Sequence, residues 1–125
     1  MKHGLLLLAH GARDANWALP FEAIVRRIRA GRPDVAVELA FLDFIAPDLP
    51  TAAERLAAAG CASVDVLPLL LGAGGHVRKD LPRLVESVAA RHPGVAWRVA
   101  PAIGEIDSVI AAMAGAAIAL LEPRR

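Results

Sequence analysis

The chain has 125 residues, of which 56% are hydrophobic and 22% charged, and its formal net charge is +1. This composition excludes a disordered or collagen-like chain, and the length predicts a single domain over residues 1–125 with its own buried core. The small net charge gives no strong field for binding nucleic acid or a membrane surface. Cys61 is the only cysteine, so the chain can form neither an internal disulfide nor a zinc site built on cysteines.

Two apolar runs have the composition of targeting or membrane segments. The first, residues 5–9, ends at His10 and is too short for the core of a signal peptide. The second, residues 109–121, falls short of the roughly 20 residues that a membrane span needs. It belongs instead to a series of large apolar residues at helical spacing: Ile106, Val109, Ile110, Met113 and Leu120. We expect a helix that packs on the core, in a cytoplasmic protein with no membrane partner.

Strand-like apolar runs alternate with amphipathic segments four times along the chain. Strands are expected at residues 4–9, 35–40, 63–71 and 95–99, and helices at 16–29, 49–59, 78–91 and 105–121. This βαβαβαβα order predicts an α/β fold, with a parallel sheet between two layers of helices. The first and third runs are continuously apolar, whereas the second and fourth alternate with polar residues. This difference predicts two central and two edge strands, in the flavodoxin-like order 2-1-3-4.

Four residues are expected to set the limits of these elements. Pro20 is tolerated only in the first turn of a helix, so a start near Leu19 is the alternative for the first helix. Asp48 is placed to cap the second helix, and Gly60 is placed to end it. Pro68 lacks a backbone N–H, so the third strand is expected to end or bulge there.

The predicted strand order also indicates where a ligand would bind. In such a sheet, ligands lie at the carboxyl ends of the strands beside the switch point, here between the first and third strands. His10 follows the first strand and His76 lies in the segment after the third. Imidazole binds Fe, Co, Ni and Zn. Two histidines on separate loops therefore suggest an open metal site, although each could instead be a hydrogen-bonded loop residue.

Other chemically active side chains are expected around the same edge of the sheet. Asp43 follows the second strand among apolar residues, where it could accept protons, assist a metal ion or simply hydrogen-bond its own backbone. Arg13, Arg78 and Lys79 lie near the amino ends of two helices, which suits an acidic ligand, although solvated surface charge is the alternative. The glycines in residues 72–75 match neither common phosphate-loop pattern.

Three motifs resemble those of the small CbiX-type sirohydrochlorin chelatases. They are HGARD from residue 10, FLD from residue 41 and PLLLGAGGHVRKDLP from residue 68. The likeness spans nearly the whole chain, and the third motif is the most specific. The resemblance implies a chelatase, a lyase that inserts Co²⁺, Fe²⁺ or Ni²⁺ into a tetrapyrrole of cobalamin or siroheme biosynthesis. It also implies a homodimer, and a metal that is bound as substrate with neither ATP nor an organic cofactor.

The resemblance assigns roles to individual residues. Two histidines of the family bind the metal, and they match His10 and His76, while a glutamate of the middle motif matches Asp43. His10, His76 and Asp43 are thus the expected catalytic residues. The side chains expected to bind the carboxylates of the substrate are those of Arg13, Arg78 and Lys79, with Gly74 and Gly75 allowing close approach. The flat ring is expected against apolar wall residues that include Trp17, Phe44, Leu70 and Leu71.

The sequence departs from the family pattern on the acidic side of the site. Asp43 is one methylene shorter than glutamate, and Ala46 stands where an acidic residue is common. A small polar residue of the first motif is replaced by Ala12. A metal or tetrapyrrole carrier without catalysis therefore remains an alternative, as does a phosphate or nucleotide binder that uses the glycine loop. For the chelatase, we expect activity to fall at acidic pH, because ligation requires neutral imidazole.

Overall fold

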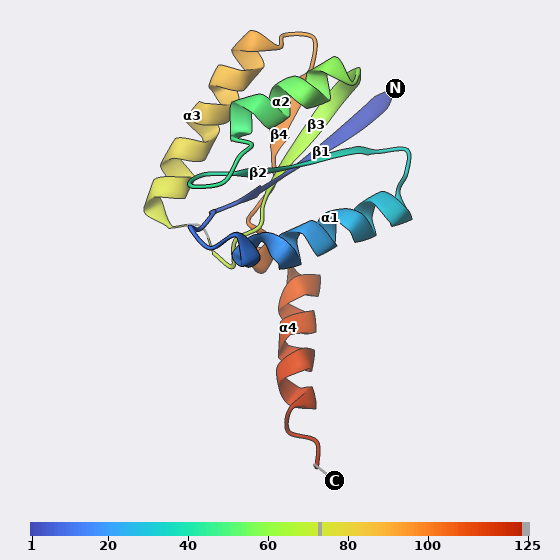
Figure 1. The fold of residues 1–125 in the computed structure, drawn as a ribbon, viewed down its shortest axis with the longest axis vertical. Coiled ribbons are helices and arrows are strands. Elements are labelled where there is room, and N and C mark those ends of the chain that lie inside the picture. The colour runs from blue at the N-terminus through green and yellow to red at the C-terminus, as the bar shows by residue number, and fades with distance from the viewer. Residues whose placement is uncertain (73, 124–125) are drawn as a thin grey trace.

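The computed structural model describes residues 1–72 and 74–123, with the side chain of His76 outside the described part. Its centre is a four-stranded sheet in which neighbouring strands are parallel, in the order β2-β1-β3-β4 (Figure 1). The strands are β1 (Lys2–Ala9), β2 (Ala36–Phe41), β3 (Cys61–Pro68) and β4 (Ala96–Val99). The predicted strand order is therefore confirmed, as is the end of the third strand at Pro68.

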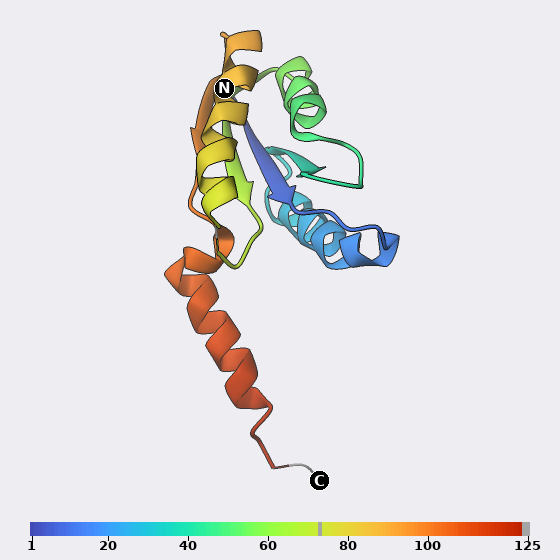
Figure 2. The same ribbon diagram turned by 90° about the vertical axis from the view of Figure 1, so that its left-hand side faces the viewer.

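Helices lie on both faces of the sheet (Figure 2). One face packs against α2 (Leu49–Ala58) and α3 (Gly75–Arg91), in a core that includes Leu6, Leu8 and Val66. The other face packs against α1 (Leu19–Gly31), in a smaller core around Leu7 and Val37. Two 3-10 turns, η1 (Ala15–Ala18) and η2 (Ile103–Glu105), and the helix α4 (Asp107–Ala119) complete the chain. This is the predicted three-layer αβα arrangement.

Two helices begin three residues away from the starts of their expected ranges, and the first of them begins at the alternative start that Pro20 indicates. The helix expected from residue 16 begins at Leu19, because the Asp14 side chain accepts a hydrogen bond from the Asn16 backbone and starts a separate 3-10 turn. Pro20 then lies in the first turn of α1, where its missing N–H has no partner to lose. The helix expected from Arg78 begins at Gly75 instead. His76 is therefore a backbone member of the first turn of α3 and not of a loop.

The amino end of α2 is fixed by a side-chain cap. The Asp48 carboxylate accepts a hydrogen bond of 2.9 Å from the backbone N–H of Thr51, as the sequence predicts. This bond to Thr51 also lowers the pKa of Asp48. The carboxylate thus stabilises the folded chain at pH values above the ordinary pKa of aspartate. That contribution disappears as the pH falls through the lowered pKa of Asp48 in the folded state.

The substitution Asp48→Ala is expected to lower the free energy of unfolding by about 1 kcal/mol at pH 7. Urea titrations followed by circular dichroism measure this difference, and it should shrink below a pH of about 4. Glu54→Ala, at an exposed position in the middle of the same helix, is the control and should change stability little. Equal effects of the two substitutions at pH 7 would show that the cap contributes nothing.

The expectation that the last helix packs on the core is wrong. The helix forms, but α4 extends away from the sheet, and none of its residues, all of which are described, is buried (Figures 1 and 2). Apolar residues cover all sides of α4, so their spacing indicates a helix without defining an inward face. No helix in the described ranges is long and apolar enough to cross a membrane.

Candidate functional site

The carboxyl ends of β1 and β2 bring His10 and Asp43 together. Beyond the strands, the backbone N–H of Leu42 donates to Ala9 and that of Asp43 donates to His10, each at 2.9 Å. Two backbone hydrogen bonds thus join the segments that follow β1 and β2. They hold the backbone of Asp43 beside that of His10.

Gly11 permits the tight turn that follows His10. Its φ is +92°, in the left-handed region that glycine adopts most readily. A Cβ atom at Gly11 would lie 1.8 Å from the backbone oxygen of Asp43. The structure therefore explains the glycine after His10 in the first motif: the backbone at residue 11 contacts the backbone of Asp43, which leaves no room for a side chain.

A cleft of about 270 Å³ opens beside these residues. Its polar lining consists of His10, Asp43 and Asp80, all exposed to solvent. Its apolar lining consists of Leu42, Val77, Leu81 and Leu84. The cleft combines a nitrogen ligand for a borderline metal ion, two carboxylates that can accept protons, and an apolar wall. These features suit a flat apolar molecule that receives a metal ion.

His76 lies at the start of α3, which forms one side of this cleft. Its neighbour Val77 lines the cleft, but the side chain of His76 is outside the described part of the structure. Its pairing with His10 therefore stays a prediction. The described side chains contain no group of three or more His, Cys, Asp or Glu residues placed to hold a metal ion.

Asp80 is the site residue that sequence reasoning missed. It belongs to the third motif but received no role. Asp80 lies four residues after His76, and residues four apart share one face of a helix. Once α3 begins at Gly75 rather than Arg78, this spacing places Asp80 on the side of α3 that carries Val77 and Leu84 toward the cleft.

The predicted cationic residues do not line this cleft within the described ranges. The Arg13 guanidinium lies 5.2 Å from the ring centre of Phe44. Arg78 forms a 3.1 Å ion pair with Glu105 and borders an adjacent cleft of about 250 Å³. The two clefts share Val77 and Leu81 as lining residues. Lys79 is exposed on α3. The three cationic side chains therefore lie around the carboxyl edge of the sheet but do not converge on the cleft.

The structure places the two glycines at the start of α3, but it does not place the expected apolar wall residues on the cleft. Gly74 caps α3, and open space lies where a side chain at Gly74 or Gly75 would project, which leaves room for a ligand at the helix start. Among the described residues that line the cleft, the apolar ones lie directly after β2 and on α3. The four expected wall residues are absent from this set: Trp17, Phe44, Leu70 and Leu71.

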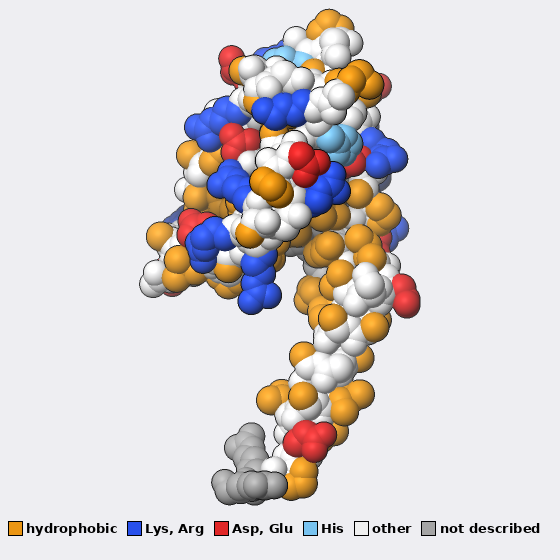
Figure 3. Space-filling view, turned by 90° about the vertical axis from the view of Figure 1, so that its right-hand side faces the viewer, with side chains coloured by type: hydrophobic (Ala, Val, Ile, Leu, Met, Phe, Trp, Pro, Cys, Tyr) orange, Lys and Arg blue, Asp and Glu red, His pale blue; other side chains and the backbone are white. Residues whose placement is uncertain are grey.

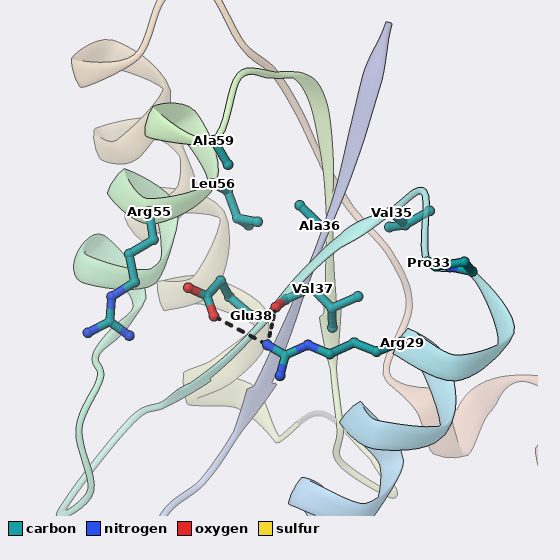
Figure 4. A pocket seen from close by; sticks show the side chains of 9 residues that line it. All are labelled: Arg29, Pro33, Val35, Ala36, Val37, Glu38, Arg55, Leu56 and Ala59. Atoms are coloured by element: carbon teal, nitrogen blue, oxygen red, sulfur yellow. Dashed lines mark hydrogen bonds and ion pairs between the residues drawn. The ribbon is translucent and has the colours of Figure 1, made fainter.

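Another cavity, of about 460 Å³, lies at the free edge of β2 (Figure 4). There the Arg29 guanidinium donates a 2.8 Å hydrogen bond to the backbone oxygen of Val37 and lies 3.8 Å from Glu38. Its lining includes Ala36, Val37 and Glu38 at the amino end of β2, whereas His10 and Asp43 lie beyond the carboxyl ends of the strands. Neither of these site residues borders it. The candidate site is therefore the cleft of about 270 Å³ that His10 and Asp43 line.

The fold is that of the doubly wound α/β proteins, whose ligands lie at the carboxyl edge of a parallel sheet. Residues 4–118 match the family model of CbiX. The chain therefore belongs to the CbiX family.

Relatives of known sequence carry chelatase names. The chain is 32% identical over 112 residues to a sirohydrochlorin cobaltochelatase of Sulfurisphaera tokodaii, with 87% of this chain and 85% of that protein covered. It is 28% identical to a sirohydrochlorin ferrochelatase of Bacillus subtilis, with 90% of this chain covered. The match spans only 43% of the Bacillus protein.

Solved structures share the fold. A CbiX protein from Marinobacter aquaeolei superposes with a TM-score of 0.83 at 34% identity, over 96% of this chain and 98% of that one. The sirohydrochlorin chelatase SirB of Bacillus subtilis, in complex with cobalt, superposes with a TM-score of 0.80 at 26% identity. This match covers 92% of this chain and 49% of SirB.

Proposed function

We propose that this protein is a sirohydrochlorin chelatase that inserts a divalent metal ion, Co²⁺, Fe²⁺ or Ni²⁺, into the tetrapyrrole without ATP. The observation that carries the proposal is the cleft that holds His10 and Asp43 against an apolar wall. Family membership and relatives named as cobaltochelatase and ferrochelatase support the same reaction. The tetrapyrrole and the metal ion are both substrates here.

The reaction replaces two protons on the ring nitrogens with one metal ion. In the proposal, His10 and His76 bind the incoming ion through neutral imidazole nitrogens and remove part of its water shell. Asp43, on the same cleft, accepts protons that leave the ring, and Asp80 is the second carboxylate within the lining. The metal dication leaves the cleft as two protons arrive on the carboxylates, so the net charge of the cleft stays the same.

The ring itself is proposed to lie on the apolar side of the cleft. Leu42, Val77 and Leu81 offer an apolar surface for its flat face. Arg13, Arg78 and Lys79 then serve the carboxylates at the periphery of the ring, and the open space before Gly74 and Gly75 admits one of them to the start of α3. We further propose that the protein works in the cytoplasm as a homodimer.

Anaerobic metal insertion followed by absorbance tests the proposed function. The intact protein is mixed with sirohydrochlorin and, in separate experiments, with Co²⁺, Fe²⁺ or Ni²⁺, and each rate is compared with a protein-free blank. The expected result is insertion above the blank with at least one ion. Metal binding without any rate above the blank would overturn catalysis and identify a carrier instead.

A further inference from the structure

A second cleft, of about 250 Å³, lies directly beside the candidate site. The two clefts share Val77 and Leu81 as lining residues. Pockets for small organic ligands usually measure about 300–1,000 Å³. The candidate cleft, of about 270 Å³, is therefore too small to enclose a molecule of four rings. A tetrapyrrole bound there extends beyond it, and the second cleft is an adjoining hollow that can receive one side of the molecule.

The charges favour the second cleft over the hollow on the other side of the candidate site. That hollow, of about 470 Å³, adjoins the candidate cleft at Asp43. Its described charged groups are two carboxylates, those of Asp43 and Asp48, and the guanidinium of Arg55. The second cleft has one charge of each sign, on Arg78 and Glu105. A substrate that carries carboxylates therefore meets less repulsion in the second cleft.

The second cleft has an apolar floor and a charged rim. Leu81 on α3 and Ala102 after β4 are 4% and 3% exposed, and both line the cleft. The side chains of Arg78 and Glu105, in contrast, are 67% and 39% exposed. This arrangement suits a side chain with an apolar stem and a terminal carboxylate. The stem can lie on the apolar floor while the carboxylate reaches the guanidinium at the rim.

Arg78 forms an ion pair at this rim that a ligand can exchange. Its Nη2 atom lies 3.1 Å from Oε1 of Glu105, which is 27 residues away in the sequence. An ion pair between exposed side chains contributes little free energy, so breaking it costs little. A guanidinium has five N–H donors in a planar fork, which can bind the two oxygens of another carboxylate. A substrate carboxylate can therefore replace Glu105 as the partner of Arg78.

The backbone holds Glu105 in place, so the arginine is the member of the pair that moves. The N–H of Glu105 donates a hydrogen bond of 2.9 Å to Ala102 within η2. The preceding residue, Gly104, lies so close to the neighbouring segment that a Cβ atom there would be 2.0 Å from the backbone oxygen of Leu71. Arg78, in contrast, is an exposed residue of α3 with a long and flexible side chain.

The next carboxylate along the chain provides a matched comparison. Asp107 begins α4, two residues after Glu105, and within the described part of the chain it forms no ion pair. No charged residue occurs from Ser108 to Leu121. Figure 3 accordingly shows hydrophobic side chains along α4, with acidic ones only near its ends. Glu105 and Asp107 thus carry the same charge at the same end of α4, but Glu105 is the one that holds Arg78.

We propose that the second cleft binds a carboxylate-bearing side chain of the tetrapyrrole, and that this carboxylate takes the place of Glu105 on Arg78. The proposal rests on the proposed function, which supplies the substrate. In the free protein, Glu105 is a positioning residue that keeps the guanidinium neutralised at the rim of the cleft. On binding, the substrate carboxylate becomes the partner of Arg78. Glu105 thus competes with the substrate, which limits the affinity and favours release of the metallated product.

Anaerobic fluorescence titration of metal-free sirohydrochlorin measures this competition. Glu105→Gln should lower the dissociation constant about threefold, because an exposed ion pair no longer competes with the substrate. Arg78→Gln should raise it about tenfold, because a charge-assisted hydrogen bond is lost. Asp107→Asn removes the same charge as Glu105→Gln and should leave the constant nearly unchanged. Circular dichroism checks that each variant is folded.

A double variant separates the exchange from a general effect of charge. In the Arg78→Gln background, Glu105→Gln should have no further effect, because Glu105 acts through Arg78. Fully esterified sirohydrochlorin, which lacks carboxylates, should bind equally to the unmodified protein and to Glu105→Gln. Three results would overturn the proposal: no tighter binding by folded Glu105→Gln, tighter binding that persists without Arg78, or an equal gain from Asp107→Asn.

The substitution Val99→Phe tests whether the substrate enters the second cleft. Val99 lines that cleft from β4 and does not line the candidate cleft, so a larger side chain narrows the second cleft alone. Sirohydrochlorin should bind more weakly, and unchanged binding by the folded variant would overturn the assignment of the second cleft.

The insertion assay separates this proposal from the proposed function. A protein that shows the exchange at Arg78 but inserts no metal contradicts the proposed function alone. A protein that inserts metal while Glu105→Gln leaves substrate binding unchanged contradicts the exchange alone. Failure of the unmodified protein to bind sirohydrochlorin would contradict both.

Discussion

Replacing His10 with alanine is expected to lower the rate of metal insertion by at least about 100-fold, without loss of the fold. His10 is the histidine whose described side chain lines the cleft, and the substitution removes an imidazole that the incoming ion requires. Its side chain is exposed, so its removal leaves no core cavity. Initial rates measured by absorbance at saturating sirohydrochlorin, over a range of Co²⁺ concentrations, give the size of the effect.

His92→Ala is the control for this substitution. His92 follows the last turn of α3 and packs near Trp97, with 6.1 Å between the ring centres, at the far end of that helix from the cleft. Its replacement should leave the insertion rate within about twofold of the unmodified protein. An His10→Ala protein that is folded and retains the full rate would exclude His10 from catalysis.

The substitution Gly11→Ala is expected to lower the free energy of unfolding by about 3 kcal/mol, the largest effect on stability that the site predicts. The left-handed backbone of Gly11 costs about 1 kcal/mol or more for alanine. The added methyl group would also meet the Asp43 backbone oxygen at 1.8 Å, so the pairing of His10 with Asp43 must shift. Urea unfolding measures the loss, and insertion by the folded fraction should fall with it.

Gly60→Ala separates the two causes. Gly60 has a φ of +88°, close to that of Gly11, but open space surrounds its missing side chain. The control therefore carries the backbone strain without the collision, and a loss of about 1 kcal/mol is expected. Equal losses at Gly11 and Gly60 would contradict the close contact with Asp43.

The order of the strands in the sheet was predictable because the pattern of apolar and polar residues in each strand reflects how far that strand is buried. The continuously apolar run at 4–9 requires cover on two sides, while the alternation at 35–40 tolerates an edge, and these differences led to the order β2-β1-β3-β4. The predicted position of the site follows from the strand order, because the strand order fixes the switch point at which the chain leaves β1 at His10. The structure then places Asp43 on the same cleft.

Other features depended on contacts that a sequence pattern does not carry. The spacing of Ile106, Val109 and Ile110 indicates a helix, but packing on the core of the same chain requires a connection long enough to turn back. Here only Ile106 separates η2 from α4, and the backbone N–H of Gly104 in η2 donates a hydrogen bond to Leu70. The place of Asp80 on the cleft was not predicted because it depends on where α3 begins, and helix limits are the least certain part of such predictions. Arg78 was expected to bind a carboxylate of the substrate. Its ion pair with Glu105, which lies 27 residues away in the sequence, is evident only from the structure.

An anomalous difference map from crystals grown with Co²⁺ tests the central claim most directly. The account predicts a cobalt peak in the cleft lined by His10 and Asp43, with an imidazole nitrogen of His10 at about 2.1 Å, the usual length for such bonds. Cobalt bound elsewhere on the protein, with no peak in this cleft at saturating Co²⁺, would contradict the assignment of the metal-insertion site.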